Sequence, residues 1–108
     1  MAESVLWTLV ACADEVPEGG VKSCDVNGRT IALSRCGGRY GAIDNRCPHM
    51  GGPLAEGEIL DGLLVCPWHG REYDPFSGEC SLGAPVQSFP VELREDGIYI
   101  GTPDAPPG

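Results

Sequence analysis

The segments CPHMGGP (residues 47–53) and CPWHG (residues 66–70) each bring one cysteine and one histidine together within a few positions. Proline follows each cysteine and glycine closely follows each histidine, which is typical of tight turns. Sixteen residues separate the first histidine from the second cysteine, and the chain has no other histidines. Two similar turns that each offer a thiolate and an imidazole favour a metal centre over scattered core residues. The predicted ligands are Cys47, His49, Cys66 and His69.

Two kinds of centre compete for these four ligands. Structural zinc also binds two cysteines and two histidines, but the cysteines usually form one closely spaced pair and the histidines another. Here each turn mixes the two residue types. In a [2Fe–2S] centre of the Rieske type, two histidines replace two cysteines on one of the irons. The mixed turns favour that centre, and zinc stays open as the alternative.

The pattern C-x-H, sixteen residues, C-x₂-H resembles the Rieske iron–sulfur family, and most of all the soluble Rieske ferredoxins that serve bacterial oxygenases. The resemblance is most specific over residues 47–85 and is compatible in strand order over nearly all the rest. It implies that the two cysteines bind an inner iron and the two histidines an outer one. It also implies that Gly83-Ala84-Pro85 forms a third loop over the cluster, the proline loop, with a simple turn as the alternative.

Departures from the family bear on the reduction potential. High-potential respiratory members have a disulfide between the cluster loops where this chain has Gly52 and Trp68, and a serine donor where it has Arg71. Tyr73 matches a tyrosine that bonds a ligand sulfur. Fewer donors to sulfur lower the potential, so we expect a value nearer about −150 mV than +300 mV. The positions expected around the cluster are Met50, Gly51, Trp68, Gly70, Arg71, Tyr73 and Pro85, with Trp68 shielding it or packing on its loop and Met50 contacting a partner or packing.

The rest of the chain predicts an all-β fold. Sixteen Gly and ten Pro in 108 residues indicate many turns, and Asn27-Gly28, Asp61-Gly62 and Asp96-Gly97 are typical hairpin tips. With the resemblance, this gives a Rieske-type fold: an antiparallel β-sandwich or barrel base and a smaller cluster-binding β subdomain at about 45–85, made of two loops plus the proline loop. One domain spans 1–101, and 102–108 is a Pro/Gly-rich tail or linker. The expected strands are Val5–Val10, Val21–Val26, Thr30–Arg35, Tyr40–Ile43, Leu63–Val65, Phe89–Arg94 and Ile98–Ile100.

The remaining cysteines are interpreted as packing residues. No basic, apolar leader opens the chain, so we expect a cytoplasmic protein with reduced thiols. In a hairpin with a two-residue turn at Asn27-Gly28, Cys24 faces Ile31 and not Cys36. We therefore expect small buried hydrophobes or surface thiols. These four cysteines are Cys12, Cys24, Cys36 and Cys80.

The net charge and the number of histidines argue against several classes of function. A net charge of −9 argues against nucleic acid and anionic membrane surfaces. A Rieske oxygenase needs a second iron held by further histidines, and none remain. No nucleotide-binding motif is present either. The resemblance therefore implies a one-electron carrier, a monomer in the simplest case, between an NAD(P)H-dependent flavoprotein reductase and a terminal oxygenase. A Rieske domain of a larger redox enzyme, or a zinc-stabilised interaction module, are the alternatives.

Overall fold

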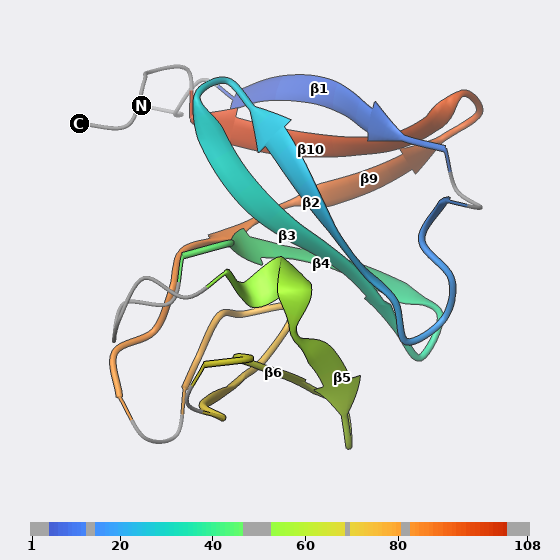
Figure 1. Ribbon diagram of the computed structural model, residues 1–108. Coiled ribbons are helices and arrows are strands. Elements are labelled where there is room, and N and C mark those ends of the chain that lie inside the picture. Colours follow the sequence, from blue (N-terminus) through green and yellow to red (C-terminus); the bar gives the residue numbers. More distant parts are fainter. Residues whose placement is uncertain (1–4, 13–14, 47–52, 69, 81–82, 104–108) are drawn as a thin grey trace.

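Three antiparallel sheets and very little helix make up the part of the chain that the structure describes (Figure 1). The computed structural model describes residues 5–12, 15–46, 53–68, 70–80 and 83–103. The all-β antiparallel prediction is confirmed. Within these residues no helix has the length and apolar character needed to cross a membrane.

Two sheets form the base of the molecule. The first has the order β1-β10-β9 and the second the order β2-β3-β4-β8. The third sheet, β5-β6-β7, is small and follows the short 3₁₀ helix η2. The bounds are β1 Val5–Ala11, β2 Val21–Val26, β3 Arg29–Cys36, β4 Arg39–Asp44, η2 Leu54–Glu56, β5 Glu58–Leu60, β6 Leu63–Val65, β7 Glu72–Tyr73, β8 Ser88–Phe89, β9 Val91–Arg94 and β10 Gly97–Pro103.

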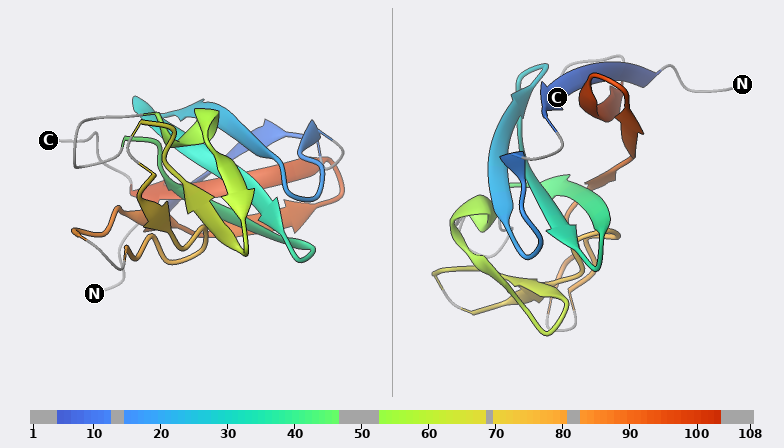
Figure 2. Two further views of the ribbon diagram at one scale, coloured as in Figure 1. Left: turned by 60° about the horizontal axis from the view of Figure 1, so that its bottom comes forward. Right: turned by 90° about the vertical axis from the view of Figure 1, so that its right-hand side faces the viewer.

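The sheet β2-β3-β4-β8 lies between the other two sheets (Figures 1 and 2). Successive residues of a strand point to opposite faces, and in β3 this alternation separates two cores. Ile31 and Leu33 pack toward β1 and β10, in a core shared with Ile98 and Ile100. Ala32 packs on the opposite face, toward the small sheet. The middle sheet is therefore buried on both sides, which explains the uninterrupted apolar run Ile31–Leu33.

Two of the three predicted hairpin tips are confirmed. Asn27 and Asp61 have φ values of +52°, and the glycine after each also has a positive φ, as a two-residue turn of this type requires. The third tip is shifted by one residue. Arg94 pairs with Gly97, so Gly97 begins β10 and the turn precedes it. A side chain at Gly97 would lie 2.5 Å from the Ala11 carbonyl oxygen, so this strand position needs glycine.

The strand predictions missed short or interrupted elements. Strands β5 and β7 have three and two residues, too few for an alternating pattern to stand out. The strand expected at Phe89–Arg94 is divided at Pro90 into β8 and β9, since proline has no N–H for a ladder. Strand β10 continues past Ile100 to Pro103, where it pairs with β1. Thr102 and Pro103, assigned to the tail, are therefore strand residues.

Candidate functional site: the turn at Cys66

Cys66 is the one predicted ligand that lies within the described residues. It follows β6, is 1% exposed and forms no disulfide. Its N–H donates to the Arg71 carbonyl oxygen at 2.8 Å, and its carbonyl oxygen accepts from Gly70 N–H at 3.0 Å. These two bonds tie Cys66 to Gly70 and Arg71 and define the Cys66 turn. A buried free thiol on a backbone-locked turn has the donor chemistry and rigidity of a cluster ligand, so Cys66 fits the predicted role.

The other predicted ligands lie outside the described residues, as do Met50 and Gly51. Among the residues that are described, no three Cys, His, Asp or Glu side chains gather around a common point. Arg46 and Pro53, which flank the first predicted loop, form a β-bridge, so the two ends of that loop lie side by side. The ligand set therefore stays a prediction, with the chain entering and leaving its first loop at one place. The predicted ligands that lie outside the described residues are Cys47, His49 and His69.

Trp68 projects from the turn that Cys66 begins. Its side chain is 55% exposed, so it packs little against the described residues. Its proposed role as a shield for the cluster is not tested and remains a prediction. Gly70, on the same turn, has a φ of +71°, which favours glycine there.

Arg71 connects the Cys66 turn with the predicted proline loop. Its carbonyl oxygen accepts from Cys66 N–H, and its guanidinium lies against Gly83. A Cβ built on Gly83 would stand only 2.3 Å from Arg71 Nη1. The guanidinium therefore occupies space that any larger residue at position 83 would fill. Pro85, two residues further on, is exposed.

Tyr73 lies at the centre of the small core beneath this turn. It is completely buried, it pairs with Leu64 across β6 and β7, and it forms a β-bridge with Cys80. The same core includes Cys66 and Val86, so the tyrosine and the predicted ligand share one apolar environment. The structure thus places Tyr73 in the same small core as Cys66, while the predicted bond from Tyr73 to a ligand sulfur is not tested.

A polar hollow of about 480 Å³ adjoins the Cys66 turn. Its lining includes Glu56 and Glu58 together with Cys66, Pro67 and Gly70. Both glutamates are exposed. Sequence reasoning did not single out these carboxylates, although they lie in the stretch between the two loops. The hollow brings negative charge next to the predicted cluster site.

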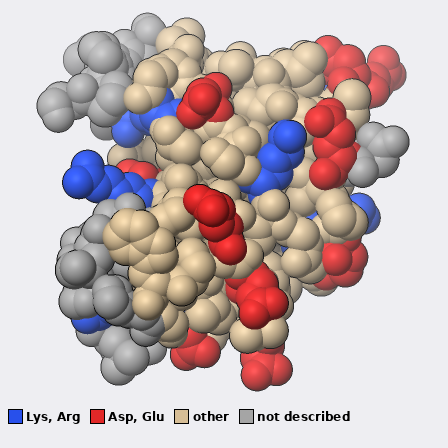
Figure 3. Space-filling model, in the orientation of Figure 1, with Lys and Arg blue, Asp and Glu red and all other residues tan. Residues whose placement is uncertain are grey.

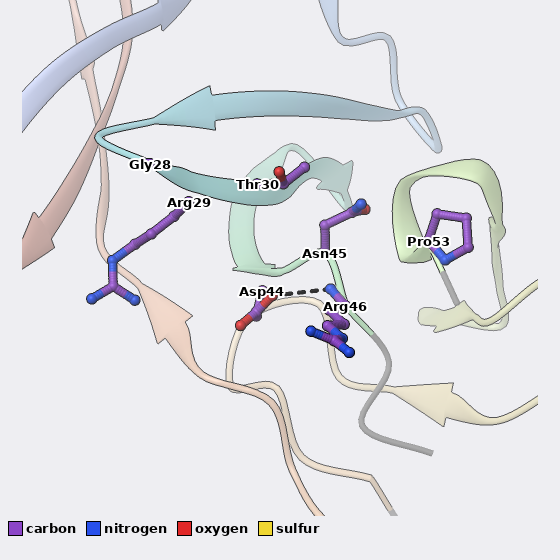
Figure 4. A pocket seen from close by; sticks show the side chains of 7 residues that line it. All are labelled: Gly28, Arg29, Thr30, Asp44, Asn45, Arg46 and Pro53. Carbon is purple, nitrogen blue, oxygen red and sulfur yellow. Dashed lines mark hydrogen bonds between the residues drawn. The ribbon is translucent and has the colours of Figure 1, made fainter. Parts of the chain in front are cut away.

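A second hollow, of about 410 Å³, lies where the chain enters its first predicted loop (Figure 4). Arg29 and Arg46 both line it, together with Asp44. The Asp44 carboxylate accepts the Arg46 backbone N–H at 2.9 Å. The mixed charges of this lining do not favour one class of ligand.

The remaining cysteines behave as packing residues. Every cysteine among the described residues is free, in agreement with the expectation of reduced thiols. Cys24 pairs with Ile31, as the hairpin register predicted, and is 6% exposed. Burial raises the pKa of the Cys24 thiol above its usual range. Cys24 is therefore a small apolar residue of the base, while Cys12 is exposed and Cys36 and Cys80 are half-buried.

Comparison with known proteins decides the family. Residues 6–91 match the model of the Rieske [2Fe-2S] domain. The chain belongs to the Rieske [2Fe–2S] domain family. The cofactor of this family is a [2Fe–2S] cluster, which excludes the zinc alternative, and the all-β Rieske-type fold is confirmed.

Two relatives match this Rieske chain over most of both sequences. It is 33% identical over 97 residues to the ferredoxin component of the naphthalene 1,2-dioxygenase/salicylate 5-hydroxylase systems of Ralstonia sp, covering 87% of this chain and 93% of the relative. It is 32% identical over 107 residues to the ferredoxin component of the alkene monooxygenase system of Xanthobacter autotrophicus, covering 96% and 88%. These relatives are electron-transfer components and not the catalytic subunits.

A solved oxygenase structure matches this Rieske chain over only part of the oxygenase's own length. Apo dicamba monooxygenase superposes with a TM-score of 0.81 at 32% identity, and the match covers 94% of this chain but 34% of that one. The same fold therefore occurs both in chains of this length and as about one third of an oxygenase chain.

Proposed function

We propose that this chain is the ferredoxin component of an oxygenase system and carries single electrons from an NAD(P)H-dependent flavoprotein reductase to a terminal oxygenase. The observation that carries the proposal is the match to two ferredoxin components over nearly the whole length of both chains. One Rieske cluster stores one electron at a time, so the chain would pass electrons singly.

The proposed cluster ligands are Cys47, His49, Cys66 and His69. When bound, the cluster supplies a site that gains and loses one electron near a fixed potential. The chain itself contributes a buried thiol at Cys66, whose turn is closed by two backbone hydrogen bonds. A ligand held in this way needs little rearrangement when the charge of its surroundings changes, which favours fast electron exchange.

The histidine count supports a carrier over an oxygenase. An oxygenase needs a second iron, typically held by two histidines and a carboxylate. Both histidines of this chain are assigned to the cluster. The chain therefore lacks residues for a substrate iron, and the oxidation of substrate belongs to its partner.

The distribution of charge supports docking at the cluster end, by which we mean the sheet β5-β6-β7 and the Cys66 turn. Asp and Glu side chains are spread over the visible face of the molecule (Figure 3), and Glu56 and Glu58 border the Cys66 turn. A partner with Lys or Arg around its own redox centre would be steered to this end. Since salt screens such attraction, the rate of reduction by the reductase is expected to fall as ionic strength rises.

Electron paramagnetic resonance of the dithionite-reduced protein tests the cluster assignment. We expect a Rieske signal with an average g below 2, with iron and acid-labile sulfide in equal amounts. His69→Ala is expected to abolish that signal. A surviving Rieske signal in this variant would remove His69 from the ligand set. Voltammetry giving a clearly positive potential near neutral pH would contradict the predicted low potential.

Reconstitution tests the carrier role. The holoprotein is mixed with a flavoprotein reductase, NAD(P)H and a terminal oxygenase encoded beside it, and substrate oxidation is followed. We expect oxidation that depends on this chain. An oxygenase that takes electrons from the reductase equally well without it would contradict the proposal. It would favour a second candidate, a Rieske domain of a larger redox enzyme, which the match to one third of dicamba monooxygenase supports.

A further inference from the structure

Arg71 is a single basic residue within a long acidic stretch of the chain. No other Lys or Arg lies between Arg46 and Arg94. Residues 53–85, which supply the sheet β5-β6-β7 and the predicted proline loop, hold six Asp and Glu side chains. Arg71 is therefore the only side chain of this stretch that is positively charged at every ordinary pH. The six acidic residues are Glu56, Glu58, Asp61, Glu72, Asp74 and Glu79.

Burial gives the charge of Arg71 more weight than the count of one against six suggests. Arg71 is half-buried, whereas five of the six acids are exposed. The sixth, Asp74, is half-buried, and its carboxylate already accepts two backbone N–H groups. Arg46, just before the first predicted loop, is exposed as well. Because water and salt screen an exposed charge more strongly than a partly buried one, the field of Arg71 acts more strongly within the cluster end.

The structure holds the Arg71 guanidinium between two segments that border the predicted cluster site. The Arg71 carbonyl oxygen accepts the Cys66 N–H at 2.8 Å, which ties the residue to a predicted ligand. Its guanidinium reaches Gly83 so closely that a Cβ there would overlap it. Beyond Gly83, the Val86 N–H donates to the Gly78 carbonyl oxygen at 2.9 Å and anchors the other end of the predicted proline loop. The cation is therefore packed into the cluster end and does not extend freely into solvent.

We propose that Arg71 raises the reduction potential of the cluster through its positive charge. The proposal rests on the cluster assigned under the proposed function. Reduction adds one electron, and hence one negative charge, to a centre beside six carboxylates. A cation packed nearby stabilises the reduced form more than the oxidised form, and so raises the potential. The expected potential stays in the lower part of the Rieske range, and Arg71 keeps it from falling further.

Gly83 contributes to this arrangement by what it lacks. Without a Cβ at position 83, the guanidinium can lie against the predicted proline loop, beside the Cys66 turn. A side chain there would move the charge away from this place. The proposal therefore predicts that the potential responds to position 83 as well as to position 71, although no charge changes at position 83.

Voltammetry of the holoprotein and of two Arg71 variants tests the proposal. Arg71→Met removes the charge, and Arg71→Lys keeps the charge but loses the planar guanidinium. We expect a more negative potential in Arg71→Met and a potential close to that of the unsubstituted protein in Arg71→Lys. An unchanged potential in Arg71→Met would overturn the proposal. So would an equal shift in both variants, because the effect would then come from the contact with Gly83 and not from the charge.

The matched control is Arg94→Met. It changes the net charge from −9 to −10, as Arg71→Met does, because each variant loses one positive charge. Arg94 ends β9, in the sheet that the middle sheet separates from β5, β6 and β7 (Figures 1 and 2). Arg94→Met should leave the potential nearly unchanged. Equal shifts in the two methionine variants would show an effect of total charge and would overturn the assignment to Arg71.

Gly83→Ala moves the charge without removing it. The potential should shift in the same direction as in Arg71→Met, but less far. If Arg71→Met loses the cluster, Gly83→Ala decides: a more negative potential supports the proposal, and an unchanged one overturns it.

Electron paramagnetic resonance of the same samples separates this proposal from the proposed function. Absence of a Rieske signal in the unsubstituted protein would contradict the proposed function. A Rieske signal with a potential that Arg71→Met leaves unchanged would overturn only the role of Arg71.

Discussion

The base and the cluster end of this protein are stabilised in different ways. Apart from β8, which has two residues, the strands of the base have four to eight residues, and two sheets enclose its core. The cluster end has strands of two or three residues. Its core includes Ala32 and Ile43, which belong to the middle sheet of the base. The cluster end therefore completes its packing with the far face of the base and has no separate core of its own.

This difference indicates that the stability of the cluster end depends on the cofactor more than the stability of the base does. Short strands supply few ladder hydrogen bonds, and a three-stranded sheet needs a packed face to be stable. The base meets that need with its own side chains. At the cluster end, the base contributes one face, and a cofactor held by the predicted ligands would link the rest. Loss of the cofactor should therefore loosen the cluster end first and leave the base folded.

Removal of Cys66, the predicted ligand that the structure describes, should have the largest effect. In Cys66→Ser we expect loss of the cluster signal and faster amide exchange at Leu64 and Tyr73, with Ile98 still protected. Hydrogen exchange followed by NMR on the variant, and on protein stripped of iron, measures this. The matched control is Cys24→Ser, which alters a buried thiol of the base and should keep the cluster while lowering global stability. Uniform loss of protection in Cys66→Ser would contradict the division.

Truncation of a buried core residue should have the next largest effect, and this effect should differ between the base and the cluster end. Ile31→Ala and Leu64→Ala each remove a fully buried side chain and should cost about 2–5 kcal/mol. In the base, Ile31→Ala should lower the melting temperature of the whole protein. At the cluster end, Leu64→Ala should instead raise local exchange and weaken cluster retention, with less effect on global melting. Identical melting and exchange profiles would show that the protein unfolds as one unit.

The contact between Arg71 and Gly83 offers a smaller effect within the cluster end. Gly83→Ala places a methyl group where the guanidinium lies; because the guanidinium ends a flexible side chain that can move aside, the cost should stay below about 1 kcal/mol. Arg71→Ala vacates that space, so the second substitution should cost little in its presence. A double-mutant cycle followed by chemical denaturation measures the coupling. Additive costs would mean that the two residues do not compete for space.

Tyr73→Phe should change the potential while largely preserving the fold. The resemblance implies that the Tyr73 hydroxyl donates to a ligand sulfur, and loss of a donor destabilises the reduced cluster. We therefore expect a more negative potential by voltammetry. The control is Tyr99→Phe, which removes a surface hydroxyl bonded to Asp96 at 2.6 Å, far from the cluster end, and should not shift the potential. An unchanged potential in Tyr73→Phe would exclude the predicted bond.

The smallest effect is expected at the turn between β3 and β4. The Glu18 carboxylate accepts the N–H groups of Gly38 and Gly37 at 2.8 Å and 2.6 Å, and these bonds hold its pKa below the usual value. Because the folded-state pKa is the lower one, Glu18 stabilises the fold above about pH 4.3, the ordinary glutamate pKa, and this contribution is lost as the pH falls further. Denaturant melts of Glu18→Gln should show a shallower acid decline; an identical decline would exclude this role.

Sequence reasoning worked best where the signal was local. The tips Asn27-Gly28 and Asp61-Gly62 were predicted because their turn type needs a positive φ that few residues tolerate. The hairpin register then placed Cys24 opposite Ile31. Sequence reasoning failed at the third tip, because Gly97 is required by the close approach of the Ala11 carbonyl oxygen, which lies far away in sequence. It also missed β5 and β7, which exist because they pair with β6.

The sequence by itself predicted the chemistry of this protein, because two short segments with one cysteine and one histidine each are local features that few functions share. It also predicted the antiparallel β class. Only the tertiary structure decided that the middle sheet is buried on both faces and that Arg71 fills the space beside Gly83. Each of these depends on residues distant in the chain, and no periodicity or spacing records such contacts.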